Sequence, residues 1–522
     1  MSEAFDVLII GSGFGGSVSA LRLAEKGYRV AVLEQGREHS ADDFQRAGLS
    51  MRHLLWAPAL GLRGPLAQKV YRNVGVVHGV GVGGGSLVYA AVLLEPQAAF
   101  YRDPAWASLD SDWQASLAPH YRRARQMLGV ADNPYQGLQD RWLAQTATAM
   151  DASGSYGPVP QGIYFGPQND AVDPFFAGQG PQRRGCNRCG SCISGCPQGA
   201  KNSLDLNYLY LARKLGVQVF SETRVSHISR HGAGYRVHLR SRTLPLRSLD
   251  AAQVIVAAGV LGSLEILFAS RERYRTLTQL PAALGEHVRT NSEAIVAIRG
   301  QSGVDVSQGT TISSHFHADA QTHITQNRFP PSYNFMRLYM GPLVDEARPL
   351  RRAGKVLGQL LRRPRHWLGH WRTADWYRRI SVLTVMQQAD NQLAFAYRRR
   401  WWRLGGFALD SRLSVGEASP TYLPQANRAA RTFAEVSGGE ALNVLPESLG
   451  NRAVTAHLLG GAVMAANPEL GVVDARHQVF GYPGLYVIDG SSIAANVGVN
   501  PSLTIAALAE RAISLWPARG AG

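Results

Sequence analysis

The feature that most constrains the fold is a glycine motif near the N-terminus that stands between two apolar runs. Residues 6–10 (DVLII) show no helical periodicity, which is typical of a buried parallel strand. The motif GSGFGG at residues 11–16 follows at once, and residues 17–26 read as a helix. A second apolar run, residues 29–33, ends at Glu34. This order of strand, G-x-G-x-x-G, helix, strand and acid predicts a doubly wound α/β fold that binds a dinucleotide.

Each residue of the motif has a physical role in such a site. Gly11 permits the tight turn, Gly13 lets backbone amides approach a pyrophosphate, and Gly16 lets the helix pack closely on the strand. Glu34 lies eighteen residues after Gly16, where it accepts hydrogen bonds from a ribose. The motif alone does not separate FAD from NAD.

Four further segments narrow the choice. A second glycine-rich loop, GVGVGGGSLVY, occupies residues 79–89, where glycine allows a flat ring or a phosphate to pack on the backbone. The C-terminal part carries TAHLLGG at residues 455–461, GYPGLYVIDG at 481–490 and NVGVNPSLT at 496–504. This set, in this order, resembles the glucose–methanol–choline oxidoreductases, and within them the bacterial cholesterol-oxidase-like branch. The resemblance covers roughly half of the chain, at both ends.

The resemblance implies bound FAD and assigns roles to individual positions. The N-terminal loop and Glu34 hold the ADP half, the loop at residues 83–86 lies near the flavin, and Val225 meets the adenine. Asp489 and Gly490 touch the ribityl-phosphate region, and the helix after Pro501 points its N-terminus at the flavin ring. The implied cofactor-binding positions are Gly11, Gly13, Phe14, Gly15, Gly16, Glu34, Gly83, Gly84, Gly85, Ser86, Val225, Asp489, Gly490 and Ser502. Tyr89 departs from the cholesterol-oxidase pattern, which usually has an Asn near the flavin.

His457 and Asn500 match the family's catalytic pair. A neutral imidazole can take the proton of an alcohol while the carbon loses hydride to the flavin, and an amide can orient the oxygen. We therefore expect FAD-dependent oxidation of an alcohol, with a lipophilic alcohol or a sterol as the substrate class. Two alternatives are a lyase or photodecarboxylase on the same scaffold, without net alcohol oxidation, and a pure electron-transfer subunit. From the sequence alone, a buried core histidine in a glycine-rich turn would also fit His457.

The four cysteines of the chain fall within eleven residues, in the spacing C-x-x-C-x-x-C-x-x-x-C-P. They are Cys186, Cys189, Cys192 and Cys196. This is the ligand run of bacterial ferredoxins, so we expect an iron–sulfur cluster that relays electrons from the flavin. A structural zinc site and metal-free thiols are the alternatives. An electron-acceptor protein or a quinone would then be a partner.

Positive charge is concentrated in one segment. The formal net charge is +16, and residues 348–403 hold fourteen Lys or Arg against two acids, with five of the ten Trp. The segment is either a cap over the substrate pocket or a patch whose Trp and Leu side chains enter a lipid headgroup layer. Nothing else in the chain supports a nucleic-acid partner. With no apolar run of about 18 residues and no leader pattern, we expect a cytoplasmic protein, peripheral to the inner face of the membrane.

The motifs also predict the domain organisation. The dinucleotide parts lie at both ends and in the middle, so the FAD-binding domain is interleaved with a mixed-sheet α+β substrate domain. We assign residues 1–100, 205–295 and 450–522 to the FAD-binding domain, and residues 101–204 and 296–449 to the substrate domain, which includes the cysteine loop at 186–197.

Overall fold

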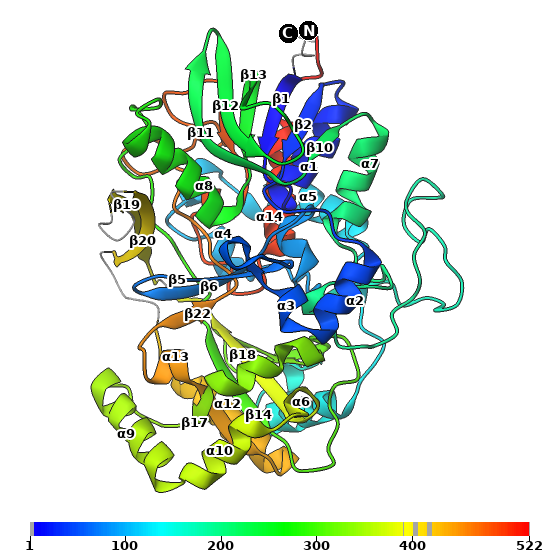
Figure 1. Ribbon diagram of the computed structural model, residues 1–522, viewed down its shortest axis with the longest axis vertical. Helices are drawn as coiled ribbons and strands as arrows, with labels where there is room; N and C mark the ends of the chain where they lie inside the picture. The colour runs from blue at the N-terminus through cyan, green and yellow to red at the C-terminus, as the bar shows by residue number, and fades with distance from the viewer. Residues whose placement is uncertain (1–4, 390, 400–405, 415–419, 521–522) are drawn as a thin grey trace.

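The molecule contains two large sheets, which lie one after the other along its long axis (Figure 1). The structure is a computed structural model that describes residues 5–389, 391–399, 406–414 and 420–520. Both ends of the chain lie beside the first sheet, at the top of Figure 1. The second sheet lies below it, and the segments between the two sheets come from both ends and from the middle of the chain.

The first sheet has a parallel centre, as the sequence predicts. Its strands run in the order β10-β2-β1-β13-β12-β11, and β23 also pairs with β13. They are β1 (Phe5–Ile10), β2 (Val30–Leu33), β10 (Gln218–Phe220), β11 (Thr223–His231), β12 (Gly234–Ser241), β13 (Ser248–Val256) and β23 (Leu485–Val487). β1 lies between the parallel strands β2 and β13, and its residues from Val7 to Ile10 are almost fully buried. Burial on both faces explains why the run carries no polar alternation.

Several helices pack beside this sheet. The main ones are α1 (Phe14–Glu25), α5 (Trp113–Met127), α7 (Tyr208–Lys214), α8 (Gly259–Phe268) and α14 (Ser502–Ser514). α14 contacts both α1 and α5, so the last helix of the chain lies against the first. Arg22 of α1 and Glu510 of α14 form a buried ion pair at 2.7 Å that fixes this packing.

The second sheet is antiparallel and has the order β17-β21-β14-β18-β16-β15-β8. Its strands are β8 (Gly157–Pro158), β14 (Ala294–Arg299), β15 (Ser314–His317), β16 (Thr322–Asn327), β17 (Met340–Pro342), β18 (Ile380–Gln387) and β21 (Glu440–Val444). Alternate residues, among them Phe316, Ile324 and Leu383, form a core with α6 (Leu138–Ala149) and α12 (Pro424–Ser437). The doubly wound FAD-type sheet and the separate substrate-domain sheet confirm the expected fold class.

Shorter elements join the two halves. β22 (Ala453–Thr455) pairs with β6 (Val74–Gly79), which pairs with β5 (Leu66–Val70), in a three-stranded sheet just before His457. The other described strands are β3 (Trp56–Ala57), β4 (Leu62–Arg63), β7 (Ala131–Asp132), β9 (Pro160–Gln161), β19 (Leu393–Arg399) and β20 (Phe407–Leu413). The other described α-helices are α2 (Ala41–Leu49), α3 (Met51–Leu54), α4 (Ala98–Tyr101), α9 (Pro349–Arg362), α10 (Pro364–Arg372), α11 (Trp376–Arg379) and α13 (Leu445–Ser448).

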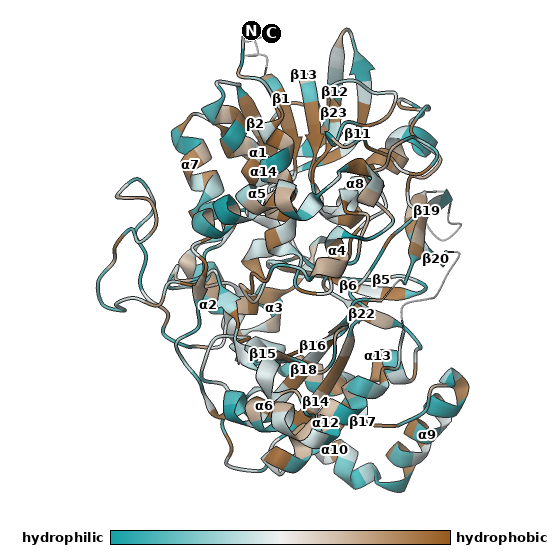
Figure 2. Cartoon of the chain, turned by 180° about the vertical axis from the view of Figure 1, so that it is seen from behind, coloured by the Kyte–Doolittle hydropathy of each residue, from teal (hydrophilic) through white to brown (hydrophobic). Residues whose placement is uncertain are grey.

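The basic segment forms α9, α10 and α11, and α9 and α10 lie at the lower margin of the molecule (Figures 1 and 2). The expectation that its tryptophans reach outward is wrong for Trp367 and Trp376, which are 4% and 1% exposed and pack in the core under the segment. Leucines are exposed instead: Leu350 by 90% and Leu361 by 79%. Residues 400–403, with the Trp-Trp pair of the sequence pattern, lie outside the described residues. No helix of the described chain is long and apolar enough to span a bilayer.

Candidate active site

The two glycine loops are packed against each other. A side chain at Gly84 would place its Cβ 2.6 Å from the Cα of Gly13, and the amide of Gly83 donates to Ser12 Oγ at 3.1 Å. Gly84 also has a φ of +55°, which L side chains rarely adopt. By contrast, a Cβ at Gly13 or at Gly85 would meet no atom within 4 Å. The loops therefore leave open space over their own backbone, as a bound cofactor requires.

Glu34 closes the first βαβ unit as a buried carboxylate. Its Oε2 accepts from the amide and the hydroxyl of Ser12, at 3.1 and 2.7 Å, and its Oε1 accepts from the amide of Gly36 at 2.8 Å. Burial raises the pKa of Glu34, and these hydrogen bonds act in the opposite direction. Glu34 thus ties the end of β2 to the glycine motif.

The C-terminal segment meets the same motif. A Cβ at Gly15 would lie 1.7 Å from the carbonyl oxygen of Ile488, so only glycine lets residues 488–489 approach α1. The buried carboxylate of Asp489 accepts from the amide of Gly259 at 2.8 Å and from Ser263 Oγ at 2.6 Å. It also accepts from the amide and hydroxyl of Ser491. With four protein donors on its carboxylate, Asp489 fixes the backbone that presents Gly490.

The other predicted cofactor-binding residues lie in the two glycine loops, at the starts of α1 and α14, and on β11. Gly11 has a φ of +101° at the turn after β1, and a Cβ on Gly16 would lie 2.0 Å from the Gly11 carbonyl oxygen. Phe14 begins α1, Ser86 is fully buried in the second loop, and Ser502 begins α14. Val225 lies buried on β11, beside a register shift in its pairing with β12.

His457 lies between an acid and an amide. Its Nδ1 contacts Glu293 Oε1, and its Nε2 lies 3.2 Å from Asn500 Nδ2. The other oxygen of Glu293 accepts from the amide of Ala456 at 3.3 Å. Since a carboxylate accepts hydrogen bonds, the proton of a neutral His457 is held on Nδ1, and the lone pair on Nε2 faces Asn500. The structure thus brings the expected pair into contact, with Nε2 of His457 toward Asn500.

The sequence analysis missed Glu293. It is 3% exposed and directly precedes the apolar strand β14, where a charged residue needs a partner. Its neighbour Ser292 is buried with a φ of +46°, and the amide of Ser292 donates to Thr290 Oγ1 at 3.1 Å. A strained residue held by side-chain hydrogen bonds is typical of a functional site. The sequence did contain a signal, because Glu293 stands directly before the apolar run at residues 294–298.

A second buried acid, Glu447, lies close enough to Glu293 to interact with its charge. Burial is the main cause that raises the pKa of Glu447 well above its ordinary value, and the neighbouring charge of Glu293 adds to it. Glu447 Oε1 is buried without a hydrogen-bond partner, which agrees with a neutral carboxylic acid. Glu293, and not Glu447, is the carboxyl group that contacts His457.

The cysteine loop lies next to the second glycine loop. Lys201 Nζ donates to the carbonyl oxygens of Leu87 and Cys192, at 2.8 and 2.7 Å, and so joins the two loops. Tyr89 packs in the same small core as Cys186, Cys192 and Cys196. The ring of Tyr89 also contacts the ring of Phe14 edge-on, with 5.6 Å between the centroids. The cysteines are therefore connected to the N-terminal motif through one aromatic pair.

The four thiols of the cysteine loop are not joined by disulfide bonds. Burial raises the pKa of the Cys192 thiol to about 11, so this thiol is protonated at neutral pH unless a cation binds it.

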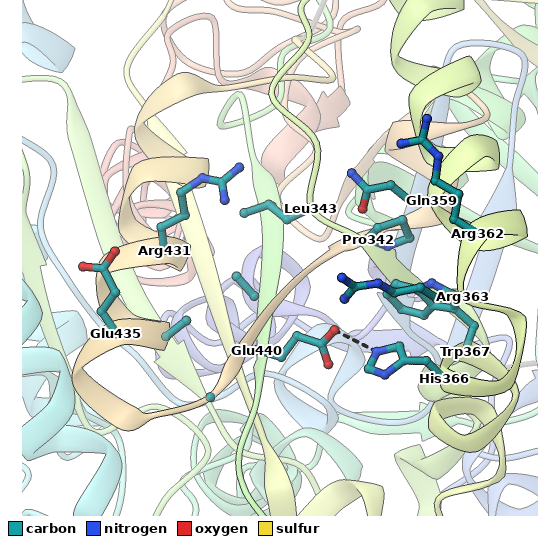
Figure 3. Close-up of a pocket in the computed structure, with 13 residues that line it drawn as sticks. Pro342, Leu343, Gln359, Arg362, Arg363, His366, Trp367, Arg431, Glu435 and Glu440 are labelled. Carbon is teal, nitrogen blue, oxygen red and sulfur yellow. Dashed lines mark hydrogen bonds and ion pairs between the residues drawn. The ribbon is translucent and has the colours of Figure 1, made fainter.

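A cavity of about 640 Å³ lies between α9, α10 and α12. Figure 3 shows the residues that line it. Arg362, Arg363 and Arg431 line it together with Glu435 and Glu440, and Glu440 accepts from His366 at 2.8 Å. Neither His457 nor Asn500 lines this cavity, so it is separate from the candidate active site.

Comparison with known proteins agrees with this geometry. A family model described as GMC oxidoreductase matches residues 367–509, and one described as FAD dependent oxidoreductase matches residues 6–311. A cholesterol oxidase of Mycobacterium tuberculosis is 41% identical over 100% of this chain and 92% of its own length. One of Acinetobacter baumannii is 38% identical over 99% of this chain and 95% of its own length. The chain belongs to the GMC oxidoreductase family. It is an FAD-dependent oxidoreductase that acts on CH–OH groups.

The fold of this GMC oxidoreductase also matches a solved structure, a pyridoxine 4-oxidase from Mesorbium loti. The TM-score is 0.63, the sequences are 15% identical, and the match covers 98% of this chain and 99% of the other. The residues of the site fit FAD: the backbone at Gly13 and Gly85 is open, and Asn500 Oδ1 is buried without a hydrogen-bond partner. This unsatisfied acceptor beside His457 leaves a place for a ligand that donates a hydrogen bond.

Proposed function

We propose that this enzyme oxidises the hydroxyl group of a sterol or another large lipophilic alcohol to a carbonyl, with His457 as the base. The observation that carries the proposal is the arrangement Glu293–His457–Asn500, in which Glu293 precedes strand β14 of the substrate sheet and Asn500 precedes helix α14. The sterol class is supported by identities of 41% and 38% to two cholesterol oxidases over nearly the whole chain.

The residues of the chain perform the proton step. Glu293 holds the proton on Nδ1, so Nε2 can accept the proton of a substrate hydroxyl. Asn500 Nδ2, now 3.2 Å from Nε2, can instead donate to the substrate oxygen and fix its position. When bound, FAD supplies the acceptor for the hydride that leaves the alcohol carbon. The carboxyl group of Glu293 is placed to stabilise the imidazolium that forms, because opposite charges in a buried site attract strongly.

The test is anaerobic reduction of the bound flavin by a panel of alcohols: cholesterol, a long-chain primary alcohol and a terpenoid alcohol. We expect the flavin absorbance to bleach with at least one of them and the matching carbonyl compound to form. An unbleached flavin across the panel would overturn the proposal. Product formation without flavin bleaching, from a cyanohydrin or from an illuminated fatty acid, would instead favour a lyase or a photodecarboxylase.

The proposal also includes an iron–sulfur cluster at Cys186, Cys189, Cys192 and Cys196, which passes electrons from the flavin to an acceptor protein or a quinone. The ligand spacing C-x-x-C-x-x-C-x-x-x-C-P, which is that of bacterial ferredoxins, supports a cluster. The contacts through Lys201 and Tyr89 connect the loop to the cofactor cradle. The backbone amides of Arg188 and Lys201 point at the sulfurs of Cys186 and Cys196, at 3.4 and 3.5 Å, and such contacts stabilise thiolates.

Metal and sulfide analysis of anaerobically purified protein tests the cluster. We expect iron and acid-labile sulfide in matched amounts, and an EPR signal after reduction with substrate. Stoichiometric zinc at the cysteines, or thiols without metal, would remove the relay and leave alcohol oxidation by FAD untouched.

An anionic lipid surface is the partner proposed for the basic segment. Leu350, Leu357 and Leu361 are exposed along α9, and Arg362 and Arg363 follow at its end. Exposed leucines beside arginines match a helix that lies in a headgroup layer, where the arginines meet lipid phosphates. Arg362 and Arg363 also line the neighbouring cavity, where Arg431 is a third arginine (Figure 3). Such contact would bring the enzyme to a substrate that partitions into lipid.

A further inference from the structure

Three histidines meet on the substrate-domain sheet. His315 and His317 lie on β15 and His323 lies on β16, where His317 is the direct cross-strand partner of His323. Phe316, between the first two, points to the opposite face and packs in the core with α6 and α12, so the histidines share the other face. His315 Nδ1 lies 2.9 Å from His323 Nε2. One ring nitrogen from each of the three lies within 4.8 Å of the other two.

The hydrogen bonds within this His315–His317–His323 cluster leave a buried ring nitrogen unused. His323 is 1% exposed, yet its Nδ1 has no hydrogen-bond partner. Leaving such a nitrogen without a partner costs about 1–3 kcal/mol. His317 is half-buried and lies at the edge, with its Nδ1 3.2 Å from the exposed Gln97 Nε2. The cluster thus has a buried end with an orphan nitrogen and an end that a small solute can reach from solvent.

The histidine face continues to the catalytic residues. His323 pairs with Met386 on β18, and Met386 Sδ lies 3.7 Å from Asn291 Nδ2. The same nitrogen of Asn291 donates to the carbonyl oxygen of Val499 at 2.8 Å, one residue before Asn500. The cluster is therefore separated from the catalytic amide by a short chain of direct contacts.

We propose that His315, His317 and His323 bind a divalent transition-metal ion of the zinc class, held by three imidazole nitrogens with the remaining coordination position open. Three histidines are a ligand set that suits zinc, copper and nickel, and three-ligand zinc sites keep a place for water or an oxygen ligand. Metal–nitrogen bonds of about 2.0–2.1 Å put ligand nitrogens about 3.4 Å apart in a tetrahedral site. In the present structure one ring nitrogen from each histidine lies within 4.8 Å of the other two, which is near that distance. This site differs in place and in ligand type from the cysteine loop.

Zinc titration of the flavin-containing enzyme, followed by X-ray absorption at the zinc edge, tests the site. We expect one zinc ion per chain with nitrogen neighbours at about 2.0–2.1 Å, and not the 2.3 Å of thiolate sulfur. His317→Gln and, separately, His315→Gln should each weaken binding at least about tenfold. His53→Gln, which alters an exposed histidine of α3, is the matched control and should bind as the wild type does.

Each outcome of the zinc titration either supports or overturns the proposed histidine site. Retained flavin content and an unchanged melting temperature in His317→Gln, together with lost zinc, support it, because the fold is then intact and only the ligand set has changed. Zinc affinity that is equal in His317→Gln, His315→Gln and the wild type overturns it, as does a spectrum with sulfur neighbours only. No stoichiometric binding by the wild type also overturns it. None of these outcomes bears on flavin reduction by alcohols, which tests the proposed function separately.

Discussion

Glu293 contacts Nδ1 of His457, which leaves Nε2 facing Asn500. The imidazole of His457 thus contacts an acid on one side and an amide on the other. Glu293 and His457 are 164 residues apart in the chain. The acid decides which nitrogen carries the proton, and so determines whether the imidazole can act as a base toward a substrate. The relationship makes separate predictions for each of the three residues.

Replacing the base should stop the chemistry and leave the cofactor bound. His457→Ala is expected to slow anaerobic flavin reduction by about 10²-fold or more, because general base catalysis contributes 10² to 10⁴. Asn500→Ala should also slow it, with a smaller effect, since the amide only orients the oxygen. Stopped-flow spectrophotometry measures both rates, and the visible spectrum reports the flavin content. A near-normal rate in His457→Ala would place the base elsewhere.

Glu293→Gln should be almost as damaging as loss of the histidine. The amide can donate to Nδ1 and so favour the tautomer that carries its proton on Nε2, where it cannot accept one from the substrate. We expect flavin reduction to fall about 10²-fold or more, with unchanged flavin content. Glu447→Gln is the matched control, because that carboxyl is already neutral and does not touch His457. Equal losses in the two variants would show that control of the His457 tautomer is not what Glu293 supplies.

Glu447 should make stability depend on pH. Its pKa in the folded protein lies well above the ordinary 4.5, so folding binds a proton there. That contribution to stability is fully present below about pH 4.5 and is lost as the pH rises through the folded-state pKa. Glu447→Gln removes the titration, so its melting temperature should fall less than that of the wild type as the pH is raised. Thermal unfolding at a series of pH values measures this, and parallel curves for the two proteins would contradict it.

Gly84→Ala should cost flavin affinity beyond the cost of backbone strain. Both Gly84 and Gly232 have a φ near +55°, but only at Gly84 does a Cβ meet another loop, 2.6 Å from Gly13 Cα. An alanine in this conformation costs about 1–2 kcal/mol at either position. We expect Gly232→Ala to retain FAD with a slightly lower melting temperature, and Gly84→Ala to release it. Flavin loss that is equal in the two variants would mean that strain alone is responsible.

Exposed leucines on α9 should govern binding to lipid. The double substitution Leu350→Ser and Leu361→Ser is expected to weaken binding to anionic vesicles at least about tenfold, because each buried leucine contributes about 1.5–3 kcal/mol. Vesicle sedimentation measures this, with neutral vesicles and high salt as comparisons. Leu60→Ser, at a leucine that is 77% exposed on another surface, should bind like the wild type. Binding that is insensitive to the α9 changes would assign the leucines another role.

The sequence alone determined the part of the protein that local geometry dictates. The run 6–10, the glycine motif and Glu34 are adjacent in the chain, and the turn, the helix start and the close packing at Gly16 follow from steric rules at neighbouring residues. The fold class followed, because a strand buried on both faces needs helices to cover it. His457 and Asn500 were found through a family resemblance, and the structure brings them to 3.2 Å.

Only the tertiary structure decided which distant groups meet. Glu293 became the partner of His457 because β14 and the segment after β22 lie side by side, a contact that no local pattern encodes. The three histidines became a cluster because β15 and β16 pair in a register that puts His317 opposite His323. Trp367 and Trp376 turned inward although their segment is strongly basic, since a helix buries one face whatever its average composition. Contacts of this kind depend on the register and packing of elements far apart in the chain, and these are fixed only when the whole core forms.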